Sequence, residues 1–151
     1  MAGYPGAVLR VGADVVEIDE MAASVARLGD RYTKRLFTPD ELGPPAGGGA
    51  PAREAVDLAE RFAAKEAALK VLAPGERELD WRSIEVRRTN TGGWGLSLYG
   101  TAAALAQEAG IGHISLSVSH AAGLAMAVAV GWPGRPRGAA AAPGVDGTEG
   151  P

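Results

Sequence analysis

The chain of 151 residues contains no cysteine, which excludes disulfide bonds, thiolate metal sites and thiol nucleophiles. No apolar run approaches the roughly 20 residues that a membrane-spanning helix needs. The net charge of −3 and the pI near 5.4 argue against nucleic acid as the main partner. The N-terminal residues lack the basic start and apolar core of a secretory signal, so we expect a cytoplasmic protein. The length predicts one domain.

Several common site motifs are also missing. The glycines at 47–49 are not followed by Gly-Lys-Ser/Thr, so they do not form a phosphate-binding loop. No serine stands in a Gly-x-Ser-x-Gly motif, which argues against a nucleophile elbow. Only two histidines are present, and their spacing makes a zinc site improbable.

Lysine is scarce as well, and two of the three lysines lie in the segment 60–70. Good helix formers fill Val56 to Leu72, and this helix carries an apolar stripe made of Leu58, Phe62, Leu69 and Leu72. Glu66 and Lys70 are four residues apart, so they lie one above the other beside that stripe. A half-buried carboxylate beside an ammonium suits metal and phosphate binding. An ion pair on a solvated helix face is the alternative interpretation.

Two further segments predict strands with polar residues at unusual positions. The run from Val8 to Ile18 is rich in β-formers but contains Asp14, which needs partners if it is buried. The run from His113 to His120 alternates strictly between apolar and polar residues. This alternation places Ile114, Leu116 and Val118 on one face and Ser115, Ser117 and Ser119 on the other. His120 follows where the strand turns.

The remaining segments predict short elements in a single domain. A helix over 20–35 is interrupted at Gly29, and a further helix starts at Thr38 as N-cap. We then expect a loop at 43–51, a hairpin of strands 83–87 and 95–99, a helix over 101–109, and a final hairpin that turns at 121–123. The expected domain covers residues 1–131, and residues 132–151 are expected to form a disordered tail.

Three motifs in this order resemble a known family. They are Gly-Ala-Asp-Val-Val-Glu-Ile at 12–18, Arg-Phe-Ala-Ala-Lys-Glu-Ala at 61–67, and His-Ile-Ser-Leu-Ser-Val-Ser-His at 113–120. Together they resemble holo-acyl-carrier-protein synthase, the small branch of the 4′-phosphopantetheinyl transferases, from about Val8 to Val130. The resemblance implies an α+β fold, with a small antiparallel sheet packed against a long central helix. It also implies transfer of 4′-phosphopantetheine from coenzyme A to a serine of an apo acyl carrier protein. The reaction releases 3′,5′-ADP and serves fatty-acid or polyketide biosynthesis.

The resemblance assigns roles to residues of the central helix and the first strand. Asp14 and Glu66 match the two carboxylates that hold Mg²⁺, and Lys70 matches a lysine near the pyrophosphate. A structural salt bridge from Asp14 to Lys70 is the alternative. Arg61 and Lys65 match positions around the cofactor phosphates, and solvated helix cations are the alternative for both.

The C-terminal motif and the choice of branch follow from the same resemblance. Ser119 and His120 match residues near the adenylate end of coenzyme A, where His120 acts as a phosphate or nucleotide contact or as a general base. His113 is expected to be structural. Val16 stands where the larger transferases have a second carboxylate, which favours the small branch. In that branch each active site lies between subunits, so we expect a homotrimer.

A basic cluster is the expected contact for the carrier protein. Charge complementarity would orient an acidic carrier helix on it, although it also fits an ordinary solvated helix end. The cluster consists of Arg27, Arg31, Lys34 and Arg35. Glu20 stands where the family commonly has an arginine that faces the carrier. Two rival functions are a coenzyme A or nucleotide-binding module without catalysis and a purely structural oligomer subunit.

Overall fold

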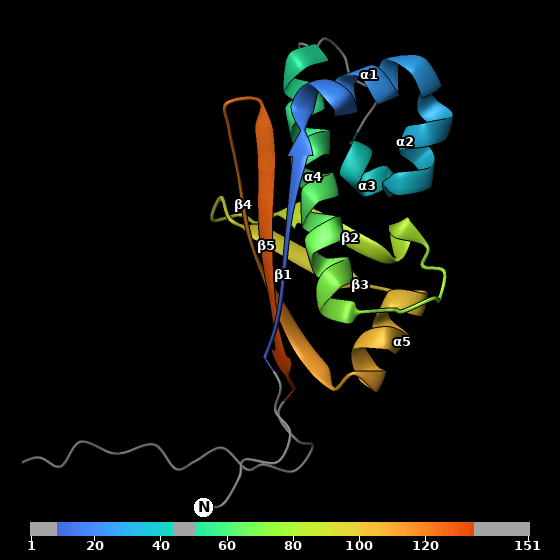
Figure 1. Ribbon diagram of the computed structural model, residues 1–151, viewed down its shortest axis with the longest axis vertical. Coiled ribbons are helices and arrows are strands. Elements are labelled where there is room, and N and C mark those ends of the chain that lie inside the picture. The colour runs from blue at the N-terminus through green and yellow to red at the C-terminus, as the bar shows by residue number, and fades with distance from the viewer. Residues whose placement is uncertain (1–8, 44–50, 135–151) are drawn as a thin grey trace, which may run out of the picture.

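The computed structural model describes residues 9–43 and 51–134 (Figure 1). In chain order the elements are β1 (Arg10–Glu17), α1 (Ile18–Leu28), α2 (Asp30–Leu36), α3 (Pro39–Leu42), α4 (Pro51–Leu72), the 3₁₀ helix η1 (Trp81–Ser83), β2 (Ile84–Arg88), β3 (Trp94–Leu98), α5 (Gly100–Glu108), β4 (Ile111–Ala121) and β5 (Leu124–Pro133). None of the helices in these ranges is long and apolar enough to cross a bilayer.

The long helix α4 is the centre of the fold. Figure 1 shows it running beside a three-stranded antiparallel sheet of order β1-β5-β4, with α1 to α3 towards one end and α5 at the other. The hairpin β2-β3 forms a second, two-stranded sheet. The α+β fold with a long central helix is therefore confirmed, although the strands divide into two sheets.

Alanine makes the close packing of α4 possible. Five of its fully buried side chains are alanines: Ala59, Ala63, Ala64, Ala67 and Ala68. A Cβ built on Gly12 of β1 would lie 2.1 Å from the carbonyl oxygen of Ala67, so the strand backbone lies directly against the helix. The expected leucine and phenylalanine stripe is divided: Leu58 and Phe62 pack in one core, whereas Leu72 packs in the other.

The helix expected over 20–35 is two helices, because Gly29 adopts a φ of 63° between α1 and α2. The cap at Thr38 is confirmed: its side chain accepts from Glu41 N, and the Glu41 carboxylate accepts from Thr38 N. Strand β5 includes Trp132 and Pro133, so the domain extends past the expected boundary at 131. The rest of the expected tail, 135–151, and most of the expected loop, 44–50, lie outside the described residues.

Candidate active site

The contact of β1 with α4 brings together the three residues expected at the reaction centre. The Lys70 ammonium lies 2.9 Å from Oδ1 of Asp14 and 2.6 Å from the carbonyl oxygen of Ala13. Both charged side chains are partly exposed. The structure thus contains the salt bridge from Asp14 to Lys70 that the sequence left open, at a position that solvent and ligands can reach.

Glu66 completes this group as a second carboxylate. Partial burial raises the pKa of Glu66, the negative charge of Asp14 raises it further, and Lys70 opposes the shift. Two mutually repelling carboxylates form a site that a cation stabilises. No group of three or more His, Cys, Asp or Glu side chains suitable for a metal occurs in residues 9–43 and 51–134. The carboxylate oxygens of Asp14 and Glu66 nevertheless fit Mg²⁺, because this ion is commonly held by one or two carboxylates together with substrate phosphates.

Lys65 does not fit the role of a phosphate contact in this structure. Its side chain is 0% exposed, and its ammonium lies 2.7 Å from Oε2 of Glu41. It also donates to the carbonyl oxygens of Leu36 and Trp81, at 2.8 Å and 3.0 Å. A buried ammonium needs such partners, and here they are all internal. Lys65 therefore joins α4 to α3 and to the segments around it.

Arg61 is also held mainly by the protein. Its Nε lies 2.7 Å from Oδ2 of Asp57, and Nη1 donates to the carbonyl oxygen of Val86. The guanidinium lies 5.9 Å from the ring centroid of Trp94. These contacts leave the side chain mostly covered, so Arg61 fixes the β2-β3 hairpin on α4.

His120 lies on the other edge of the sheet from Asp14. Asp14 is on β1 and His120 is on β4, and both strands flank β5. His120 Nδ1 lies 2.9 Å from Oε1 of the buried Glu60. Ser119 is exposed and pairs with the exposed Met126, whereas His120 pairs with the buried Ala125. The two adjacent residues therefore point to opposite faces of the sheet.

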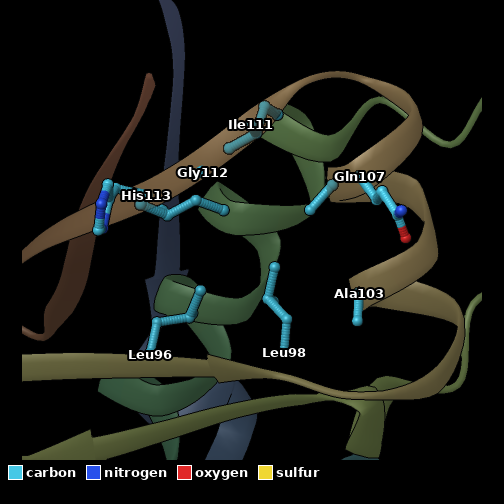
Figure 2. Close-up of a pocket in the computed structure, with 9 residues that line it drawn as sticks. Leu96, Leu98, Ala103, Gln107, Ile111, Gly112 and His113 are labelled. Atoms are coloured by element: carbon cyan, nitrogen blue, oxygen red, sulfur yellow. The ribbon is translucent and has the colours of Figure 1, made fainter. Parts of the chain in front are cut away.

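A cavity of about 460 Å³ lies apart from all of these residues, between β3, α5 and β4 (Figure 2). Leu96, Leu98 and Ala103 line it, together with Gln107 and His113. The ring of His113 lies 5.7 Å from that of Trp132. This packing agrees with the structural role expected for His113.

The basic cluster is distributed over two helices. Arg27 lies in the last turn of α1, and Arg31, Lys34 and Arg35 lie on α2. All four side chains are exposed, and Lys34 forms an ion pair with Asp30 at 3.0 Å. Glu20 is exposed in the first turn of α1. It precedes Arg27 by seven residues, which places it about 10 Å away along the helix axis.

Comparison with known proteins identifies the family. The family model of the 4′-phosphopantetheinyl transferase superfamily matches residues 10–129. A holo-[acyl-carrier-protein] synthase from Frankia alni is 43% identical over 126 residues, which cover 82% of this chain and 97% of the relative.

Solved structures agree with the sequence comparison. The structure of holo-ACP-synthase from Plasmodium yoelii has a TM-score of 0.74 at 26% identity and covers 86% of this chain and 99% of that one. The ACPS-CoA complex of Chronobacterium ammoniagenes has a TM-score of 0.65 at 28% identity and covers 85% and 99%. This chain belongs to the 4′-phosphopantetheinyl transferase superfamily, among the holo-acyl-carrier-protein synthases.

Proposed function

We propose that Asp14, Glu66 and Lys70 form the reaction centre at which this chain transfers 4′-phosphopantetheine from coenzyme A to a serine of an apo acyl carrier protein. The observation that carries the assignment is the contact of β1 with α4, which gathers two carboxylates and one ammonium at a solvent-accessible position. These groups suit coenzyme A as substrate. Attack on its pyrophosphate requires neutralisation of the phosphate charge and alignment of the reacting groups, which an ammonium and a carboxylate-bound cation can supply.

Asp14 and Glu66 would hold Mg²⁺, which neutralises charge on the pyrophosphate oxygens when it is bound. The Lys70 side chain is long enough to bring its ammonium from Asp14 to a phosphate oxygen. There it would stabilise the negative charge that develops on the leaving 3′,5′-ADP. The same ammonium can supply a proton to that group.

We also propose a homotrimer with active sites between subunits, which two features of the sheet support. The face that points away from α4 exposes large apolar side chains, a composition typical of surfaces that other chains cover. They are Val11, Val15, Met126, Val128 and Trp132. In addition, Asp14 and His120 stand on opposite edges of one sheet, so a neighbouring chain could bring its own His120 to the reaction centre. The measurement is the mass in solution by light scattering, and a monomer at assay concentration would contradict this assembly.

The carrier protein would dock on α1 and α2. Their exposed cations suit an acidic helix, and Leu28 adds an exposed apolar side chain next to Arg27. A cytoplasmic location stays a prediction, which cell fractionation tests.

The activity is tested by mass spectrometry of an apo carrier protein incubated with the chain, coenzyme A and Mg²⁺. A gain of one phosphopantetheine is the expected result. Asp14→Ala and Glu66→Ala should abolish the gain while keeping the fold, and Glu108→Ala on the exposed surface of α5 is the control. Binding of coenzyme A without any transfer, for every carrier tried, would favour the non-catalytic binding module.

A further inference from the structure

The Lys70 ammonium occupies a position beside Asp14 that a metal ion bound to the same carboxylate would also use. It lies 2.9 Å from Oδ1 of Asp14, and the exposed fractions of the two side chains are 50% and 22%. Its second acceptor is the carbonyl oxygen of Ala13, at 2.6 Å. Both contacts cross from α4 to the neighbouring strand β1. Because solvent reaches this ion pair, it can open without leaving a fully buried charge unpaired.

Glu66 makes this contact different from an ordinary surface ion pair. Within residues 9–43 and 51–134, Lys70 pairs with Asp14 on the strand, although Glu66 is four residues earlier on its own helix. Partial burial and then the charge of Asp14 raise the pKa of Glu66, whereas Lys70 lowers it, so all three groups influence one another. When both carboxylates are ionised, one ammonium compensates only one of the two negative charges.

An ammonium and a divalent cation compete for this position. Oδ1 of Asp14 already accepts a hydrogen bond from Lys70, whereas Mg²⁺ requires oxygen ligands in octahedral geometry at about 2.0–2.1 Å. Two cations placed on one carboxylate also repel each other. A divalent ion brings two positive charges to the two carboxylates, so it compensates them better than the ammonium does. The flexible four-carbon stem of Lys70 allows its ammonium to move away while the helix stays in place.

We propose that Lys70 is the internal cation of the metal site in the metal-free chain, and that a divalent cation binds by displacing its ammonium from Asp14. The assignment of Asp14 and Glu66 as metal ligands rests on the proposed function, whereas the position of Lys70 rests on the contacts above. Displacement gives Lys70 a second state, in which its ammonium is available to an anion. Metal binding therefore precedes the contact of Lys70 with a phosphate.

Titration of the full chain with Mn²⁺, followed by the EPR signal of the free ion, measures metal affinity without coenzyme A or a carrier protein. Lys70→Met should bind Mn²⁺ about five-fold more tightly, because the metal no longer has to break an ion pair. The matched control is Lys34→Met. Lys34 also pairs with an aspartate, Asp30, at 3.0 Å and is exposed, but it lies on α2. Its substitution should leave the Mn²⁺ affinity unchanged.

NMR distinguishes displacement from simple repulsion between the metal and a lysine that stays in place. The chain has three lysines, so Lys34→Met and Lys70→Met assign the ¹³Cε signals of all three. Addition of Mg²⁺ should shift the Lys70 signal and increase the mobility of its ε-methylene group, measured by ¹³C relaxation. The signals of Lys34 and Lys65 should stay in place. Asp14→Asn should give Lys70 a similar mobility without metal, because the amide keeps the shape of the side chain but removes its charge.

The outcomes separate this proposal from the proposed function. A Lys70 ε-methylene group whose mobility stays the same when Mg²⁺ binds would overturn the displacement, even if Lys70→Met binds metal more tightly. Wild-type Mn²⁺ affinity in Lys70→Met would overturn it as well, and neither result would affect the transfer activity. A chain that binds neither ion would overturn this proposal together with the metal assignment. A chain that releases Lys70 on metal binding but modifies no carrier protein would overturn the proposed function alone.

Discussion

Lys65 gives the sharpest test of the structure, because the sequence predicts that it binds a phosphate whereas the structure places it in a buried ion pair. A phosphate contact would affect coenzyme A affinity, whereas a buried ion pair affects folding. The Lys65 ammonium is fully buried, and burial lowers the pKa of this lysine while the Glu41 carboxylate opposes the shift. We therefore expect Lys65→Ala to destabilise the fold and to leave coenzyme A affinity of the folded chain unchanged.

The size of the effect follows from what remains after the substitution. Removing one partner of a buried ion pair typically costs about 3–5 kcal/mol. Glu41 keeps hydrogen bonds from the backbone N–H groups of Thr38 and Val86, at 2.7 Å and 2.9 Å, which favours the lower end. For a domain of this size about 3 kcal/mol corresponds to a fall in Tm of roughly 10 °C. Thermal unfolding followed by circular dichroism measures it.

A double-mutant cycle identifies the ion pair as the cause. Lys65→Met keeps most of the buried volume but leaves the Glu41 charge unpaired. Adding Glu41→Gln removes that charge and keeps an amide oxygen for one of the two backbone N–H donors, so the double variant should recover part of the lost Tm. A Lys65→Met variant with a wild-type Tm and a ten-fold weaker coenzyme A affinity would refute the reasoning, because Lys65 would then face the cofactor.

Three further outcomes are expected. Gly12→Ala should lower both Tm and kcat, because its Cβ would lie 2.1 Å from the Ala67 carbonyl oxygen and force β1 away from α4; wild-type values for both would contradict this packing. Glu66→Gln should raise the Tm of the metal-free chain near pH 7. Because the pKa of Glu66 is raised in the folded chain, the ionised carboxylate destabilises the fold above that pKa. The gain in Tm should therefore shrink as the pH falls through the folded-state pKa towards 4.5. A gain in Tm that grows at low pH would contradict this reasoning. Glu20→Arg should lower KM for an acidic carrier a few-fold with kcat nearly constant and a smaller gain at high salt, and an unchanged KM would mean that Glu20 does not face the carrier.

The proximity of Asp14, Glu66 and Lys70 was better predicted from the sequence than the contacts around them. The proximity of Asp14 and Glu66 was predicted from the family resemblance, because no local pattern connects a strand residue with a helix residue 52 positions later. The burial of Lys65 has a local signal in the sequence. Lys65 lies between Phe62 and Leu69 on the apolar stripe, at steps of three and four, so helical periodicity places it towards the core.

The contacts of the buried Glu60 with Arg88 and His120 had no comparable signal in the sequence. Arg88 and His120 are 28 and 60 residues from Glu60, and each looks like an ordinary surface residue in its own strand. Their proximity depends on how the β2-β3 hairpin and the end of β4 meet α4. Strand register and hairpin placement are tertiary properties, which the alternation of residues along one strand does not determine.

The three lysines show how environment decides what one side chain type can do. Their side-chain exposures are 67% for Lys34, 0% for Lys65 and 50% for Lys70. Lys34 forms a solvent-screened pair with Asp30, of little energetic weight. Lys65 cannot separate from Glu41 without leaving a buried charge unpaired. Lys70 alone combines access to solvent with a neighbouring second carboxylate. In the proposed reaction, Lys70 would exchange Asp14 for a phosphate oxygen once another cation neutralised that carboxylate. Occupancy of the proposed metal site would then be coupled to the availability of the ammonium.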